Sequence, residues 1–248
     1  MEKIPTGIEG LDRVLYGGIP SGSVVLISGS SGTGKTILGT QFLIRGAEEQ
    51  RERGMFVSLD ERPSNLREDF KDIGFEIESL EKKDDLIMLD AASPKVGLVS
   101  DEEYVARFGL EVDSLLNDIS RIHNEKDVDR IVIDSLPLIA FRTEEGVGTT
   151  IYRLMSLLNE LDSTALVITE REEGSAKISR YGVEQYAARG VILLNTRMVG
   201  NEMRRNLLIK KIRGGDHDRR RYPFEISKGG IEVYPYPDVY SKRGQKTF

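Results

Sequence analysis

Eight consecutive residues, 29–36, have the types and spacing needed to bind a polyphosphate. They read Gly-Ser-Ser-Gly-Thr-Gly-Lys-Thr and fit the pattern G-x-x-x-x-G-K-[ST] without a mismatch. Glycines allow a tight loop whose backbone N–H groups point at one anion, and the helix that follows adds its positive end. A chance Gly- and Ser-rich turn would not need the strand before it and the helix after it, which the flanking pattern predicts. The expected phosphate-binding residues are Ser30, Ser31, Gly32, Thr33, Gly34, Lys35 and Thr36.

A metal ligand is predicted at the end of an apolar run. Asp134 follows Arg130-Ile131-Val132-Ile133, which is typical of a buried strand that ends in an acid. At the carboxyl edge of a parallel sheet such a carboxylate can hold Mg²⁺ together with the Thr36 hydroxyl. The alternative is an aspartate that only caps a helix. Beside a phosphate-binding loop we favour Thr36 and Asp134 as the metal site.

Two adjacent acids end another predicted strand. Asp60 and Glu61 follow residues 55–59, which read Met-Phe-Val-Ser-Leu. Carboxylates next to bound phosphates can activate water for hydrolysis, and a positioned base typically contributes about 10²–10⁴-fold. The alternative is a pair of solvated loop charges, one of which caps the next helix. Spacing does not decide which acid carries the role.

Two cations lie two residues apart near the end of the chain. Lys211 and Arg213 belong to the segment Leu-Leu-Ile-Lys-Lys-Ile-Arg-Gly-Gly-Asp-His over 207–217, so on a strand they project from one face. They could complete the nucleotide site of a neighbouring subunit, as an arginine finger does. Spacing alone favours a surface charge pair that protects a strand edge.

Further arginines form a basic cluster in the sequence. Arg204 and Arg205 are followed by a run at 219–221, with Arg219 a candidate phosphate contact and His217 close by. Such a cluster could contact phosphates of a nucleotide or of nucleic acid, although a solvated or intersubunit face is commoner. Only two aromatic residues, Tyr222 and Phe224, interleave with it, so a base-stacking platform has little support.

Composition excludes several classes of site. The chain has 248 residues, a net charge of −6, no cysteine and two histidines, so disulfides and thiolate metal sites are excluded and a zinc site has few ligands. No signal peptide is evident and no apolar run approaches the roughly 20 residues of a membrane span. We expect a cytoplasmic protein. The acidic total argues weakly against extensive nucleic-acid binding.

Strand and helix patterns alternate up to Gly190, which predicts a parallel sheet with crossover helices. After it come short strands and tight turns. We expect one α/β domain over 1–240, with a mostly parallel central sheet flanked by helices and a C-terminal β-hairpin extension, and a mobile tail over 241–248. The expected helices are 36–51, one capped by Ser64 that runs to Asp72 before Gly74, 102–125 with Leu110 on its apolar side, and 147–161; long loops are expected over 91–101 and 171–180.

Taken together, these motifs resemble the KaiC family within the RecA superfamily, and specifically single-domain relatives of the circadian clock ATPase, which has two such modules in tandem. The opening Thr-Gly-Ile-Glu-Gly-Leu-Asp over 6–12, the acid pair, Ile133-Asp134-Ser135, and the segment 211–217, which matches K-x-R-G-x-x-H, all resemble family motifs. The resemblance covers about 6–234. This chain has Asp60 where the family usually has Glu. Gln185 and Tyr186 fall near the positions of the Ser-Thr pair that the second module of the clock protein autophosphorylates, so we do not expect a phosphorylation timer of that kind here.

The resemblance implies a RecA-like core and a ring, hexameric in the family, with ATP and Mg²⁺ between subunits. It implies that Lys211, Arg213 and His217 reach the nucleotide of the adjacent subunit, which reverses the preference drawn from spacing. The first hypothesis is therefore a Mg²⁺-dependent regulatory ATPase with catalytic residues Lys35, Asp60, Glu61, Lys211 and Arg213 and an unknown protein partner. The alternatives are a DNA-binding recombinase-like ATPase and an ATP-bound assembly scaffold with negligible turnover.

Overall fold

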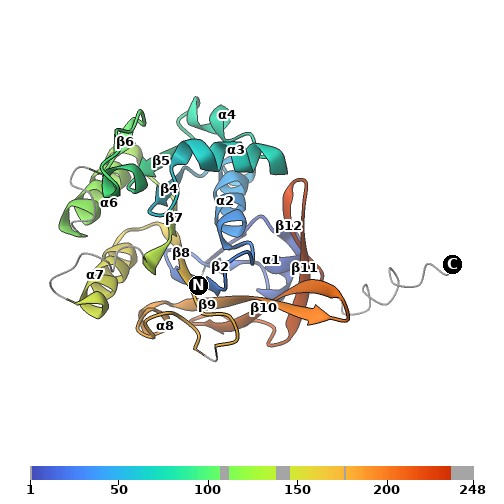
Figure 1. Cartoon of the computed structure of the whole chain (residues 1–248). Coiled ribbons are helices and arrows are strands. Elements are labelled where there is room, and N and C mark those ends of the chain that lie inside the picture. Colours follow the sequence, from blue (N-terminus) through green and yellow to red (C-terminus); the bar gives the residue numbers. More distant parts are fainter. Residues whose placement is uncertain (1, 107–111, 138–145, 176, 236–248) are drawn as a thin grey trace.

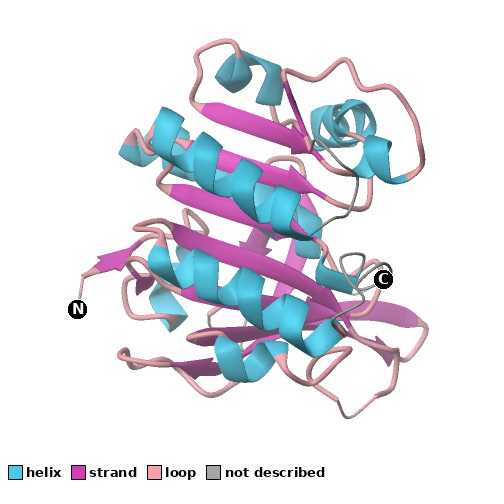
Figure 2. Cartoon of the chain, turned by 90° about the vertical axis from the view of Figure 1, so that its left-hand side faces the viewer, coloured by secondary structure: helices cyan, strands magenta, loops and turns pink. Residues whose placement is uncertain are grey.

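The structure is a computed structural model that describes residues 2–106, 112–137, 146–175 and 177–235. Within them, ten strands form one sheet in the order β12-β11-β10-β9-β3-β8-β7-β4-β5-β6 (Figures 1 and 2). Neighbouring strands from β9 to β6 are parallel. Those from β9 to β12 are antiparallel. The expected mixed α/β fold with a C-terminal β extension is confirmed.

The parallel strands are apolar on both sides because helices cover both faces of the sheet. All residues of β3, β4, β5 and β7 are buried. The parallel strands are β3 (Val24–Gly29), β4 (Gly54–Ser58), β5 (Leu86–Asp90), β6 (Tyr104–Val105), β7 (Arg130–Asp134), β8 (Thr164–Glu170) and β9 (Gly190–Val199). The antiparallel extension is β10 (Glu202–Ile212), β11 (Arg221–Ser227) and β12 (Gly230–Val233), and a separate two-stranded sheet pairs β1 (Lys3–Ile4) with β2 (Ile19–Pro20).

Two helix layers produce two hydrophobic cores, one on each face of the sheet. The first core packs α1 (Glu9–Val14), α2 (Lys35–Arg45), α3 (Pro63–Ile73) and α4 (Ile77–Glu81) against the sheet. The second packs α6 (Val112–Lys126), α7 (Val147–Glu160) and the short α8 (Glu184–Ala187) against the other face. In Figure 1 these two layers lie on opposite sides of the strands.

Strand register brings the polar strand ends to one edge. Gly29 of β3 pairs with Glu170 of β8, and Ser58 of β4 pairs with Asp134 of β7. Because these strands are parallel and adjacent, their carboxyl ends meet where ligands bind in open α/β sheets.

Several expected element boundaries were wrong. Ser64 is not the cap of α3: the helix begins at Pro63, with Arg62 at the cap position and no side-chain capping bond. Proline is well suited to the first helical turn because its missing N–H has no intrahelical partner there. Gly74 does end α3, in the left-handed conformation with φ 94°.

The helix expected over 102–125 is also wrong at its start. Tyr104–Val105 forms the edge strand β6, and α6 begins at Val112, while Leu110 lies outside the described residues. Pairing of Leu89 with Tyr104 extends the sheet by one strand, so tertiary pairing overrides the local pattern. The loop expected over 91–101 contains one short helix, α5 (Ala92–Lys95).

The helix expected over 36–51 is α2 continued by a π-helical turn, η1 (Gly46–Gln50). The tail expected over 241–248 lies outside the described residues.

Candidate functional site

The phosphate-binding loop joins the end of β3 to the start of α2, as expected. Gly32 and Gly34 have φ values of 73° and 93°, a left-handed backbone that favours glycine. The Thr33 hydroxyl donates to the Ser30 carbonyl at 2.8 Å, which closes the loop on itself. Lys35 is buried and its Nζ also donates to the Ser30 carbonyl, at 2.9 Å. The side chains of the loop therefore help to hold its shape.

The two predicted metal ligands lie in direct contact. The Thr36 hydroxyl donates to Asp134 Oδ2 at 2.6 Å. Burial raises the pKa of Asp134 to about 6, although the Thr36 hydrogen bond and the nearby Lys35 charge oppose the shift. A hydroxyl and a carboxylate are hard oxygen donors, which suit Mg²⁺. Mg²⁺ bound beside a nucleotide commonly takes one or two protein oxygen ligands together with phosphate oxygens, which these two donors fit.

The acid pair lies at the same edge of the sheet. Asp60 and Glu61 are exposed and follow β4, and both line the cavity that contains Lys35 and Asp134. Burial, and then the charges of Asp69 and Asp60, raise the pKa of Glu61. The Ser58 hydroxyl donates to the Glu61 carbonyl and so fixes the turn that carries both acids. A raised pKa favours the Glu61 carboxylate as a proton acceptor.

These groups surround one cavity of about 680 Å³. Its polar side comprises the phosphate-binding loop and the strand-end acids, whereas its apolar side comes from α2, α3 and β11. The apolar lining residues are Ile37, Leu66, Phe70, Ile73 and Ile226. A cavity with phosphate donors at one side and an apolar wall at the other suits a nucleotide.

Glu170 is a site residue that the chemical analysis of the sequence missed. It ends β8, and its Oε1 lies 3.7 Å from Lys35 Nζ. Burial lowers the pKa of Lys35, and the charges of Glu170 and Asp134 oppose that shift and favour the ammonium form. The available signal was an acid directly after the buried strand, the same pattern that identified Asp134.

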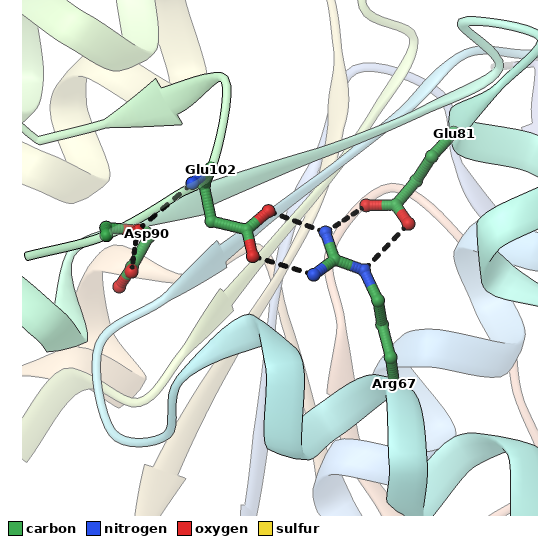
Figure 3. Close-up of polar contacts among 5 residues, drawn as sticks. Arg67, Glu81, Asp90 and Glu102 are labelled. Atoms are coloured by element: carbon green, nitrogen blue, oxygen red, sulfur yellow. Dashed lines mark hydrogen bonds and ion pairs between the residues drawn. The ribbon is translucent and has the colours of Figure 1, made fainter.

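The α3 wall of the cavity is held by a three-residue ion network (Figure 3). Arg67 of α3 donates to both oxygens of Glu81, at 2.6 and 2.8 Å. It also donates to both oxygens of Glu102, at 2.6 and 2.7 Å. Glu102 in turn is held near Asp90 at the end of β5, because Ser100 Oγ donates to Asp90 at 2.6 Å and accepts from the Glu102 N–H. The network ties α3 to α4 and to the sheet edge.

Lys211 and Arg213 do not line this cavity. Lys211 of β10 pairs with Val191 of β9, which in turn pairs with Leu26 of β3. Leu26 lies three residues before Gly29, where the phosphate-binding loop begins, so Lys211 is displaced from the loop by about 10 Å along the strand direction. The Lys211 Nζ donates to the carbonyls of Gln185 and Ala188, both at 2.7 Å, and Arg213 donates to Tyr186 at 3.5 Å. The two cations share one face, as expected, but beside α8 and away from the phosphate-binding loop of their own chain.

The remaining predicted contacts also lie outside the cavity. His217 and Arg219 belong to the loop between β10 and β11, where burial lowers the pKa of His217. The arginine cluster is split: Arg205 pairs with Phe224, whereas Arg221 pairs with Leu208, three positions further along. Of these arginines, Arg205 alone lines the cavity. Sequence proximity grouped residues that strand pairing separates.

None of the described helices is both long and apolar enough to cross a membrane.

Comparisons with known proteins agree with this geometry. The family model described as "ATPase: KaiC" matches residues 4–238. The UPF0273 protein of Methanocaldococcus jannaschii is 33% identical over 95% of this chain and 97% of its own length. The circadian clock oscillator protein KaiC of a Nostoc species is 34% identical over 95% of this chain, which spans 44% of the clock protein.

A solved structure is similar over nearly its whole length. It is the crystal structure of a KaiC-like protein of the hyperthermophilic archaeon Pyrococcus horikoshii, with a TM-score of 0.83 and 36% identity over 94% of this chain and 99% of that one. The mostly parallel sheet with flanking helices therefore matches a KaiC-like RecA fold. With the phosphate-binding loop, the strand-end acids and this match along almost the entire chain, the protein belongs to the KaiC ATPase family.

Proposed function

We propose that this chain binds ATP with Mg²⁺ and hydrolyses it slowly, as a regulatory ATPase of KaiC type. The observation that carries the proposal is one cavity lined by Lys35, Thr36, Asp134 and the pair Asp60 and Glu61. Binding alone would need only the loop; the carboxylates beside it supply the groups that hydrolysis requires.

Each residue has a defined task in this proposal. The loop N–H groups and Lys35 bind the phosphates, and Thr36 with Asp134 would hold Mg²⁺. The bound ion would neutralise charge that develops on the phosphates. Glu61 orients the attacking water and accepts its proton, which its raised pKa favours. Asp60 adds negative charge beside Glu61 and is not required to receive the proton.

We further propose that the ATP lies between subunits of a ring. Lys211 and Arg213 lie too far along the sheet to complete the site of their own chain, yet both lie beside α8, where Arg213 is exposed and Lys211 is half-buried. An arginine supplied by a neighbour stabilises transition-state charge and contributes about 10³–10⁵ in rate where it is known. Hydrolysis at such an interface would loosen the ring and change the surface offered to a protein partner.

The test is ATP hydrolysis by purified protein with Mg²⁺, with and without single-stranded DNA. We expect Glu61→Gln to lower the rate at saturating ATP by about 10²–10⁴-fold, and Lys35→Ala to abolish nucleotide binding. The control is Glu68→Gln. Glu68 is an exposed residue of α3 that does not line the cavity, so this change should leave the rate unchanged.

Two other outcomes would replace the proposal. DNA-stimulated hydrolysis with a steep salt dependence would identify a recombinase-like motor. Tight ATP binding with a rate that Glu61→Gln does not change would identify an assembly scaffold.

A further inference from the structure

Arg205 of β10 faces the helix layer that carries the phosphate-binding loop. Side chains alternate along a strand, so Arg205, Leu207 and Ile209 share one face. Leu207 and Ile209 are buried in the first core, with Leu38 and Phe42 of α2. Arg204, next in sequence, points to the opposite face.

The neighbour of Arg205 on this face packs against the phosphate-binding loop itself. Arg205 pairs with Phe224 of β11, and Ile226 follows two residues later on the same face. A Cβ placed on Gly34 would lie 2.7 Å from Ile226 Cδ1, so Ile226 contacts the loop closely. Arg205 and Ile226 together form the wall that the antiparallel extension contributes to the cavity.

Within the described part of the chain, no side chain is found to hold the Arg205 guanidinium in place. Its Nε is buried without a hydrogen-bond partner, and no carboxylate among the described residues forms an ion pair with it. Arg204 is different, because its guanidinium contacts Glu202 at 3.0 Å on the outer side of the sheet. A buried guanidinium donor without an acceptor is costly, which indicates that a ligand supplies the acceptor.

We propose that Arg205 binds the α- and β-phosphates of the nucleotide held by its own chain. This inference rests on the proposed function. β10 lies two strands from β3, on the side away from β8, β7 and β4, whose ends carry Glu170, Asp134 and the acid pair. The terminal phosphate belongs beside those acids, so Arg205 reaches the phosphates that ATP and ADP have in common. An arginine suits this role because its planar fork donates two parallel hydrogen bonds to phosphate oxygens.

The role has a specific kinetic signature. An interaction with the α- and β-phosphates is equally strong in the ground state and the transition state, so its loss raises KM and leaves kcat nearly unchanged. Loss of this interaction also weakens the binding of ADP as much as the binding of ATP. A contact with the terminal phosphate would instead lower kcat and spare ADP.

The experiment compares Arg205→Gln with Arg204→Gln, a matched change on the opposite face of the same strand. Titration with fluorescent ADP and with a fluorescent non-hydrolysable ATP analogue, both with Mg²⁺, gives the affinities. We expect Arg205→Gln to weaken both ligands by about 10–100-fold, as for a charge-assisted hydrogen bond, with kcat within about threefold. Arg204→Gln should change neither by more than about twofold.

Thermal unfolding of the ligand-free variants, followed by circular dichroism, separates a binding defect from misfolding. Arg205→Lys keeps the charge but loses the fork, so we expect intermediate affinities from a folded protein. Unchanged ADP binding by folded Arg205→Gln would overturn the inference, as would a loss confined to the ATP analogue with a fall in kcat. Failure of the proposed function would be seen in a different measurement, because the unmodified protein would then either fail to bind both ligands or fail to hydrolyse ATP.

Discussion

At the scale of single residues, the charge state of Asp134 links the stability of the protein to its function. Burial raises the pKa of this carboxyl from 3.8 to about 6, so its charged form is unfavourable in the ligand-free protein. In its proposed role as a Mg²⁺ ligand, Asp134 must nevertheless be ionised at neutral pH. The site would then maintain a destabilising charge that the bound ion compensates, which is typical of functional positions.

Replacement of this carboxyl tests that link. Between pH 4 and about 6 the folded chain binds more protons than the unfolded chain, so the free energy of unfolding falls as the pH rises through this range. At pH 7.5 we expect Asp134→Asn to stabilise the ligand-free protein by up to about 3 kcal/mol, and by less at pH 5. Denaturant unfolding followed by circular dichroism measures this, since the chain has no tryptophan. Equal stabilities of the two proteins at both pH values would contradict the expectation.

At the scale of elements, the position of α3 depends on Arg67, whose guanidinium forms ion pairs with two carboxylates. Arg67, Glu81 and Glu102 side chains are 16–20% exposed, so the network is mostly shielded from water. Hydrogen bonds to both acids hold the pKa of Arg67 above its usual range. Because Leu66 and Phe70 of the same helix line the cavity, the network also fixes the apolar wall.

We expect Arg67→Met to lower the free energy of unfolding by about 2–3 kcal/mol, somewhat less than for a fully buried pair, because it leaves two acids unpaired. It should also raise KM for ATP, through the displaced helix. The free energy of unfolding of Arg67→Lys should lie between those of the parent and of Arg67→Met, because an ammonium group cannot form bidentate hydrogen bonds with both carboxylates. Unfolding curves and steady-state kinetics measure both effects. A variant as stable as the parent would show that the two acids do not need their cation.

Helix glycines give a second test at this scale. A Cβ on Gly46 would lie 2.4 Å from Nε of the buried Arg130, which packs over Phe42 and pairs with Glu52. We expect Gly46→Ala to destabilise by about 1–3 kcal/mol despite the better helix propensity of alanine. Gly148→Ala in α7, where the nearest atom is 3.9 Å away, should instead be neutral or stabilising by up to about 1 kcal/mol. Stabilisation by both changes would contradict the close packing at Arg130.

At the scale of the whole molecule, a site shared between subunits predicts complementation. In the proposed ring, Lys35→Ala would lack the lysine that binds phosphate and Arg213→Ala would lack the cation given to the neighbouring subunit, so each variant should be inactive alone. In rings assembled at random from equal amounts of the two variants, about a quarter of the interfaces pair an intact loop with an intact Arg213, so we expect about a quarter of the parent hydrolysis rate. Size-exclusion chromatography with ATP establishes that the variants assemble together. Co-assembly without recovered activity would show that the two residues do not serve one shared site.

The sequence was sufficient where function depends on neighbours in the chain. A phosphate-binding loop uses consecutive backbone N–H groups, so the motif at residues 29–36 was enough to locate the loop. The acids at 60, 61 and 134 were predicted because each follows an apolar strand, and parallel strands carry such residues to one edge. The family resemblance rests on the same local motifs.

Tertiary structure decided what depends on pairing between distant segments. Glu170 approaches Lys35 because β8 lies beside β3, and Arg67 of α3 forms an ion pair with Glu81 of α4. Strand pairing separates Arg205 from the arginines at 219–221. Register also placed Lys211 and Arg213 beside α8, away from the loop of their own chain. Residue spacing fixes the face on which a side chain lies, but only strand order and register fix what it meets, because hydrogen bonding between strands is non-local.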